Sequence, residues 1–97
     1  MANYIPRGGP AKKKDLLAKR EQELLKVIRF GALDEQVIRA AGRVREARLA
    51  VLKATKAGLP NDETLAVRTK KIDSESARWN AMTVIEIINE YEKTALA

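Results

Sequence analysis

The chain has 97 residues, of which 45% are hydrophobic, 33% are charged and only 4% are aromatic, and its formal net charge is +6. It contains neither cysteine nor histidine, which excludes disulfides, thiolate and imidazole metal sites, cysteine nucleophiles and histidine-dependent catalytic triads. The length predicts one domain, and an aliphatic composition without strand-forming runs is typical of an all-α bundle or coiled coil.

The N-terminal end is rich in residues that break regular structure. Pro6, Gly8, Gly9 and Pro10 fall within five positions, so we expect a disordered basic tail over residues 1–11 and a single helical domain over residues 12–97. This end lacks the apolar core of a signal peptide, and no stretch approaches the ~18 apolar residues of a membrane span. We therefore expect a cytoplasmic protein with no membrane contact.

The apolar residues between positions 12 and 30 fall within half of a helical wheel, with charged residues largely opposite. This pattern predicts an amphipathic first helix over residues 12–30. Its apolar face consists of Leu16, Leu17, Leu24, Leu25, Val27 and Ile28. Gly31 can supply the left-handed conformation that commonly closes a helix, and Asp34 is a suitable N-cap for the next one.

Turn-forming residues also bound two further helices. The second is predicted over residues 35–57, with Gly58 as its left-handed closing residue and Pro60 preventing its continuation. A third is predicted over residues 62–95, capped by Asn61. Because neither Gly nor Pro follows Pro60, we expect the third helix to run without a break.

Residues spaced by seven indicate how the second and third helices pair. The second helix carries a valine series and an alanine series, namely Val37, Val44, Val51 and Ala40, Ala47, Ala54. The third carries a series of large residues, Leu65, Ile72 and Trp79. If the chain folds back at residues 58–61, each alanine of the second helix faces a large residue of the third helix. The two residue numbers in each facing pair then sum to 119. This match of small with large residues predicts an antiparallel helical hairpin. The alternative is two independent amphipathic stripes with commensurate periods.

Apolar residues left over by this pairing indicate a further neighbour. Ile38, Leu49 and Leu52 form a second strip on the second helix. The first helix either folds back to complete a three-helix bundle or continues along the overhanging end of the third helix. Both placements leave apolar surface exposed. This favours either a homodimer, which would form a dimeric helical bundle, or a complex with a partner protein. The predicted partner interface consists of Val84, Ile85, Ile88 and Tyr91.

Our leading hypothesis is thus a non-enzymatic protein-interaction module, and the simplest alternative is a monomeric core completed by the first helix. A second function is suggested by charge, since residues 1–30 hold eight basic against three acidic residues, whereas residues 59–97 hold five against seven. A basic N-terminal half suits a nucleic-acid-binding accessory protein. The candidate phosphate contacts are Arg7, Lys12, Lys13, Lys14, Lys19, Arg20, Arg39 and Arg43. The same asymmetry also fits internal complementarity with the acidic third helix.

A small helical enzyme that binds an anionic metabolite through Arg, Lys and Glu is the third hypothesis. All-helical chorismate mutases are similar in size and need neither His nor Cys, but their residue pattern has no convincing match in this chain. Ser74 and Ser76 lack an identifiable activating base, so we interpret them as polar helix surface. We therefore expect no catalytic residues, no metal and no cofactor.

Overall fold

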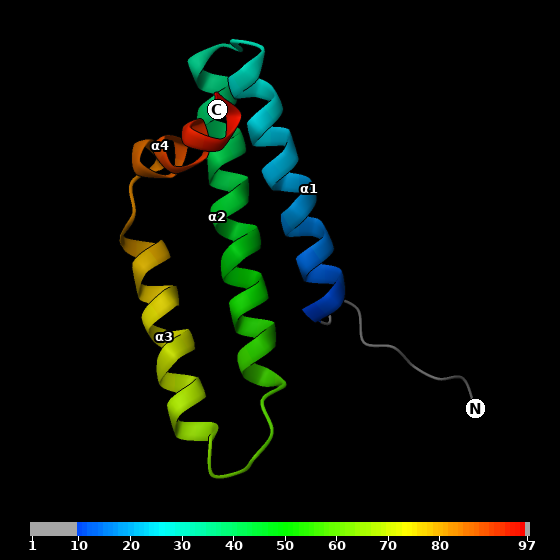
Figure 1. The fold of residues 1–97 in the computed structure, drawn as a ribbon, viewed down its shortest axis with the longest axis vertical. Coiled ribbons are helices and arrows are strands. Elements are labelled where there is room, and N and C mark those ends of the chain that lie inside the picture. Colours follow the sequence, from blue (N-terminus) through cyan, green and yellow to red (C-terminus); the bar gives the residue numbers. More distant parts are fainter. Residues whose placement is uncertain (1–9, 97) are drawn as a thin grey trace, which may run out of the picture.

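The computed structural model describes residues 10–96, and this part of the chain folds into four α-helices without a β-strand (Figure 1). They are α1 (Pro10–Arg29), α2 (Asp34–Ala57), α3 (Leu65–Ala81) and α4 (Val84–Ala95). In Figure 1, α2 stands between α1 and α3, and α4 crosses one end of the molecule. The predicted all-α class and the antiparallel hairpin of the second and third helices are confirmed.

The helix α1 begins at Pro10, two residues before the expected start. Proline is tolerated there because the first N–H groups of a helix have no intrahelical partner. Residues 10 and 11 of the expected tail are therefore helical, and residues 1–9 lie outside the described residues. At the other end, Gly31 has a φ of 62°, and the N–H groups of Gly31 and Ala32 donate to the carbonyl groups of Ile28 and Val27. This is the hydrogen-bond pattern of a Schellman motif, so the expected left-handed closure is confirmed.

Three expected turn details are wrong. Asn61 does not cap α3, whose N-cap is Thr64. Asp34 is the first residue of α2 and Leu33 holds the cap position, with no side-chain cap hydrogen bond. Gly58 ends α2 at a φ of −95°, so it is not left-handed, and its N–H donates to the carbonyl groups of Ala54 and Thr55. In the connection that follows, the Asp62 carboxylate accepts hydrogen bonds from the N–H and the hydroxyl of Thr64, and α3 starts only at Leu65.

The expectation of one unbroken helix over residues 62–95 is wrong. The chain leaves the helical conformation at Met82 and Thr83, which have extended backbone angles, and α4 starts at Val84. Thr83 and Glu86 form a capping box there, which satisfies backbone N–H groups at the new helix start. The break lets α4 turn across the bundle, and this buries the apolar side of a segment that would otherwise overhang α2.

The core lies along α2, and α1 folds back against it, as the first of the two expected placements required. The three largest fully buried side chains come from different helices: Leu24 of α1, Val44 of α2 and Ile87 of α4. Leu49 and Leu52 of the second apolar strip are half-buried against this core. The helix α4 packs on both α1 and α2, whereas α3 lies beside α2 alone among the described helices. α1 and α3 therefore flank α2 on opposite sides instead of closing a compact three-helix bundle.

Contacts between α2 and α3 do not follow the expected register. Lys56 Nζ lies 2.7 Å from Asp73 Oδ1, and the guanidinium carbon of Arg48 lies 4.8 Å from the centre of the Trp79 ring. Arg45 donates a hydrogen bond to the Met82 carbonyl group. The residue numbers in these pairs sum to 129, 127 and 127. The expected register, in which the residue numbers of facing pairs sum to 119, is therefore wrong for these contacts. They place Trp79 opposite Arg48 and not opposite Ala40.

Candidate functional site

An apolar groove lies at the end of the molecule where the α1–α2 turn meets α4. Its volume is about 350 Å³. Its floor and walls are mainly aliphatic side chains, namely Val27, Ile28, Val37, Ile38, Ile85 and Ile88. These residues come from the last turns of α1, the first turns of α2 and the first turns of α4. The groove is therefore assembled from three segments that are distant in the sequence.

Two local structures hold these segments together. Gly31 reverses the chain between α1 and α2, so that the turn itself forms one wall of the groove. The capping box of Thr83 and Glu86 starts α4 in a direction that carries Ile87 into the core. At the far end of α4, Arg29 Nε donates a hydrogen bond of 3.2 Å to the Ala95 carbonyl group. Both ends of α4 are thus fixed, and the opposite wall of the groove is held in place.

Large hydrophobic side chains are exposed around this groove. Their exposed fractions are 77% for Phe30, 73% for Leu33, 48% for Ile38, 67% for Ile85 and 69% for Leu96. Five large hydrophobic side chains at one end of the molecule are therefore about half exposed or more. Surfaces of this kind mark interaction sites more often than ordinary solvent-facing surface.

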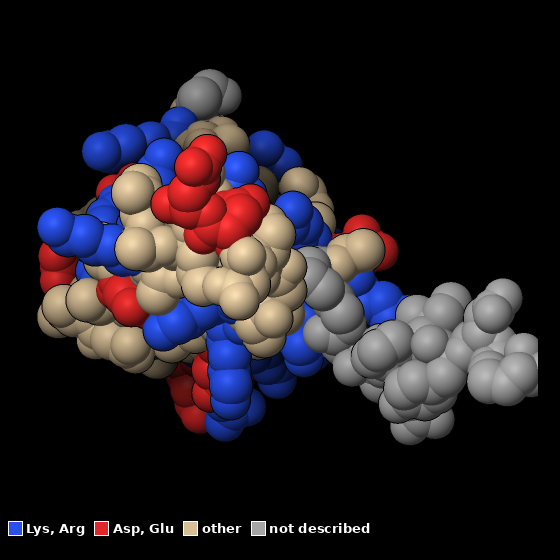
Figure 2. Space-filling model, turned by 90° about the horizontal axis from the view of Figure 1, so that it is seen from below, with Lys and Arg blue, Asp and Glu red and all other residues tan. Residues whose placement is uncertain are grey.

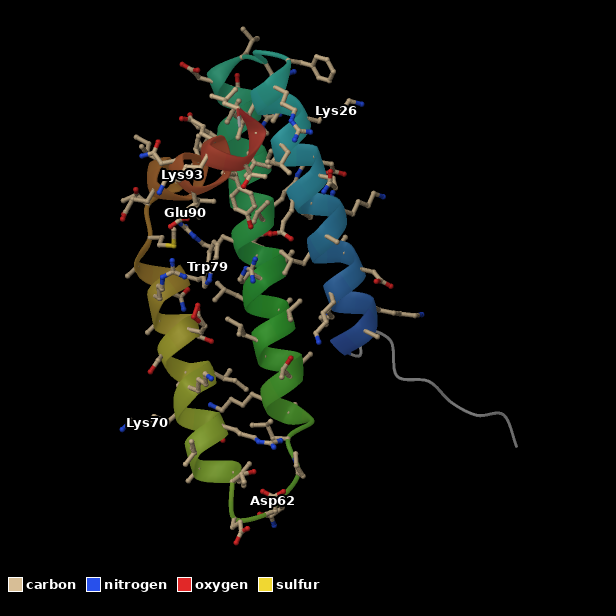
Figure 3. The ribbon with its side chains drawn as sticks, in the orientation of Figure 1. Lys26, Asp62, Lys70, Trp79, Glu90 and Lys93 are labelled. Atoms are coloured by element: carbon tan, nitrogen blue, oxygen red, sulfur yellow. The ribbon has the colours of Figure 1, made fainter. Side chains whose placement is uncertain are left out.

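The charges at this end of the molecule are separated. The charged side chains that line the groove are the carboxylates of Asp34 and Glu92. The last turn of α1, just before the exposed Phe30, instead carries Lys26 and Arg29. Figure 3 shows Lys26 extending outward from this end of α1. The two carboxylates of the groove and the two basic residues at the end of α1 therefore lie at the same end of the bundle, where Arg29 also donates to the Ala95 carbonyl group.

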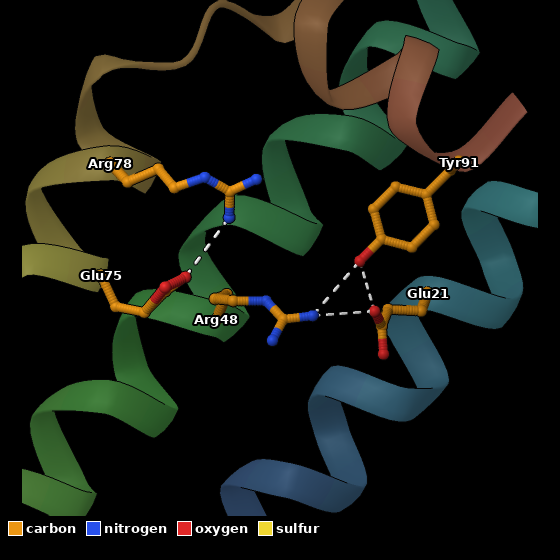
Figure 4. Close-up of polar contacts among 5 residues, drawn as sticks. All are labelled: Glu21, Arg48, Glu75, Arg78 and Tyr91. Carbon is orange, nitrogen blue, oxygen red and sulfur yellow. Dashed lines mark hydrogen bonds and ion pairs between the residues drawn. The ribbon is translucent and has the colours of Figure 1, made fainter. Parts of the chain in front are cut away.

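A polar cluster joins all four helices below the groove (Figure 4). Arg48 of α2 donates to the Glu21 carboxylate at 3.0 Å and to the Tyr91 hydroxyl at 3.4 Å, and the Tyr91 hydroxyl donates to Glu21. The Arg48 guanidinium also lies over the Trp79 ring, which points from α3 toward α2 in Figure 3. Arg78 of α3 reaches Glu90 of α4 at 3.6 Å. These contacts brace the helices around the core.

Tyr91 is an unsuitable acid or base at neutral pH. Burial raises the pKa of Tyr91 to about 12, and the hydrogen bond to Glu21 acts in the same direction, while Arg48 partly opposes it. The Glu21 carboxylate is held by both Arg48 and Tyr91. The carboxylate, the guanidinium and the phenol thus contact one another, and the buried Arg48 Nε has no hydrogen-bond partner among the described residues. Mutual contacts of this kind are typical of a brace between helices.

The candidate phosphate contacts form no continuous basic surface. Arg20 pairs with Glu23 at 3.1 Å and Arg39 pairs with Glu35 at 2.9 Å. Arg43 shares a shallow groove between α1 and α2 with Glu46. Lys12, Lys14 and Lys19 are exposed on α1 and Lys13 is half-buried, while Arg7 lies outside the described residues. On the face shown in Figure 2, basic and acidic side chains are interspersed.

The four predicted interface residues all lie on α4, but their surroundings differ. Ile85 is exposed, whereas Val84, Ile88 and Tyr91 are half-buried against the core. The sequence interpretation missed Phe30 and Leu33, which the turn leaves exposed beside the groove. A signal for them was present, since two large apolar residues flank Gly31 in a segment that was expected to be a turn.

Comparisons with protein-family models, with curated proteins and with solved structures found no match. Within residues 10–96, none of the helices has the length and apolar character that crossing a membrane requires.

Proposed function

We propose that this chain is a helical protein-interaction module that binds another polypeptide in the apolar groove between the α1–α2 turn and α4. The observation that carries this proposal is the coincidence of the groove with five exposed large hydrophobic residues at one end of the bundle. Burial of apolar side chains is the main favourable contribution in most protein associations. Exposing so many of them at one place costs solubility, and a bound partner removes that cost.

The shape of the groove also supports this function. It is lined mainly by aliphatic side chains with two carboxylates, a combination that binds apolar side chains in the centre and orients a partner through charge at the edge. Its walls belong to helices whose ends are fixed by hydrogen bonds, so the surface is largely formed before a partner arrives. A preformed surface loses little conformational entropy on binding.

Substitution within the groove and at a matched distant position tests this proposal. Ile85 and Val67 are similarly exposed, at 67% and 71%, but Val67 lies on α3 near the opposite end of the bundle. In the protein purified from its host, native mass spectrometry should give a particle heavier than the 10.8 kDa chain. Ile85→Lys should reduce that particle to the mass of one chain, and Val67→Lys should not. A single-chain mass for the unsubstituted protein would contradict the proposal.

The proposed function is non-enzymatic. The polar cluster that most resembles a reactive site has its carboxylate, guanidinium and phenol engaged with one another. The raised pKa of Tyr91, about 12, keeps its phenol protonated near neutral pH. Both features favour a structural role for these residues.

Nucleic-acid binding is the second candidate, and one observation favours it. Lys12, Lys13, Lys14 and Lys19 gather in the first half of α1, and within residues 10–96 no ion pair engages them. Free lysines on one helix could neutralise phosphates. The ion pairs of Arg20 and Arg39 confine this basic region to one end of α1, which supports weak and sequence-independent binding at most.

A further inference from the structure

The groove and a protrusion that could fill it lie side by side on the same molecule. Gly31 and Ala32 of the α1–α2 turn line the groove, and Phe30 and Leu33 flank them in the same turn. Both flanking side chains are more than two-thirds exposed. One end of the bundle thus presents an apolar knob, formed by the side chains of Phe30 and Leu33, next to the apolar groove. A two-fold interface requires this combination, because each molecule must supply both of the contacting surfaces.

The charges of the two features are complementary. Lys26 and Arg29 precede Phe30 in the last turn of α1, so this side of the knob is basic, while Asp34 follows Leu33 on its other side and Arg29 Nε donates to the Ala95 carbonyl group. The groove carries the carboxylates of Asp34 and Glu92. Placing the knob of one molecule in the groove of another can bring Lys26 of each molecule toward a carboxylate of the other. Complementary charges of this kind fix the orientation of a complex and speed its formation.

The exposed side chains at this end suit the centre of a dimer interface. Phe30 and Leu33 are 77% and 73% exposed, and the charged residues around the groove can form a polar rim about them. We expect a dissociation constant of roughly micromolar order, because association must first overcome the loss of translational and rotational freedom.

We propose that the occupant of the groove is the Phe30–Leu33 turn of a second copy of this chain. Two molecules then form a two-fold dimer in which the turn of each fills the groove of the other. This inference rests on the proposed docking function and specifies its partner. It differs from that function in requiring no other protein.

The aromatic side chain at position 30 makes a direct test practical. Phe30 is the only phenylalanine in the chain, so its ring protons can be identified without ambiguity. The experiment mixes unlabelled protein with protein carrying ¹³C-labelled isoleucine methyl groups and records isotope-filtered nuclear Overhauser effects. Effects between the Phe30 ring of one molecule and the methyl groups of Ile38, Ile85 or Ile88 of another are expected. A dimer without these effects would overturn the proposal.

Sedimentation equilibrium of the purified chain supplies the second measurement. The unsubstituted protein should dimerise, and Phe30→Ser should raise the dissociation constant at least about tenfold, as expected for a central aromatic side chain. Val67→Ser removes a similarly exposed side chain on α3 and should leave the constant unchanged. Both positions are exposed, and circular dichroism can verify that the variants keep their helix content.

The outcomes separate this inference from the proposed function. A purified chain that stays monomeric, combined with a heavier particle from host cells that Ile85→Lys dissociates, overturns the second-copy occupant and retains the docking function. A monomer from both sources defeats both proposals. A dimer that tolerates Phe30→Ser would place the interface elsewhere and would also overturn the inference.

Discussion

Thr83 and Glu86 cap the start of α4 reciprocally. The Thr83 hydroxyl accepts a hydrogen bond of 3.1 Å from the Glu86 backbone N–H, and the Glu86 carboxylate accepts one of 2.9 Å from the Thr83 backbone N–H. We expect Thr83→Ala to lower the free energy of unfolding by about 1 kcal/mol, because it leaves a backbone N–H at the helix start without its partner. Chemical denaturation measures this difference. Ser74→Ala, on the exposed surface of α3, is the control and should change stability little.

The same capping box makes α4 sensitive to acid. Hydrogen bonds from the backbone N–H and the hydroxyl of Thr83 lower the pKa of Glu86 from its usual value of 4.5. Its folded pKa lies below its unfolded pKa, so this stabilisation is present above pH 4.5 and is lost as the pH falls through the lower folded value. Glu86→Gln keeps an acceptor for the cap and removes the titration. The acid-induced loss of stability should therefore be smaller in Glu86→Gln, and an equal loss would contradict this assignment.

Ile87 and Ile85 should respond very differently to truncation. Ile87 is fully buried and Ile85 is 67% exposed, although they are two residues apart on α4. Ile87→Ala should cost about 2–5 kcal/mol of unfolding free energy through lost burial and a new cavity. Ile85→Ala should stay within about 0.5 kcal/mol in the monomer. Urea denaturation at low protein concentration provides the comparison, and similar costs for both would mean that α4 packs on a different face.

Titration of the Tyr91 phenol should make the stability of the protein depend on pH. This phenol has a folded pKa of about 12 against an ordinary value of 10, so its contribution to stability is complete below pH 10 and is lost as the pH rises through about 12. Tyr91→Phe should cost about 0.5–1.5 kcal/mol at neutral pH, because it removes the hydroxyl between Glu21 and Arg48. The variant should also lose less stability between pH 10 and pH 12 than the unsubstituted protein. Thermal unfolding across this pH range measures both effects.

Binding to nucleic acid should be weak and dependent on salt. Lys12, Lys13 and Lys14 are three of the available phosphate contacts on α1, and replacing each with Ala should reduce the log–log salt slope on duplex DNA by up to ~0.9. We expect a dissociation constant in the non-specific range of ~10⁻⁴ to 10⁻⁶ M at physiological salt. Fluorescence anisotropy over a salt series measures both quantities. A submicromolar affinity that these substitutions abolish would favour the nucleic-acid function over the docking function.

The sequence predicted the helical class, the α1–α2 turn and the α2–α3 hairpin because local signals determine them. The apolar half of α1 and the glycine at position 31 are features of single segments, and Gly31 indeed adopts the left-handed conformation. The break after α3 had its own local signal, since Thr83 and Glu86 have the spacing of a capping box. The absence of Gly and Pro outweighed that signal in the sequence interpretation, although a helix can end without either residue.

Register and site depended on contacts that no single segment encodes. Matching small and large residues predicted Ala40 opposite Trp79, yet the Trp79 ring stacks with Arg48 and Arg45 hydrogen bonds to the Met82 carbonyl group. Contacts of long basic side chains can thus select a helix register that differs from the one predicted by matching small with large side chains. The groove was also hidden, because its walls come from α1, α2 and α4 and form only once α4 has turned. Ile85 was predicted as an interface residue from its apolar surroundings alone.

The backbone of α3 lies beside a single neighbouring helix and contacts α4 through the Arg78–Glu90 ion pair, which has a consequence for local opening. The neighbouring helix is α2, whereas α1 and α4 pack on α2 and on each other. Elements with few packing neighbours open at a lower free energy than the rest of a domain. The amides of α3 should therefore exchange with deuterium before those around Leu24 and Ile87, through an excursion that detaches this helix and leaves the groove intact.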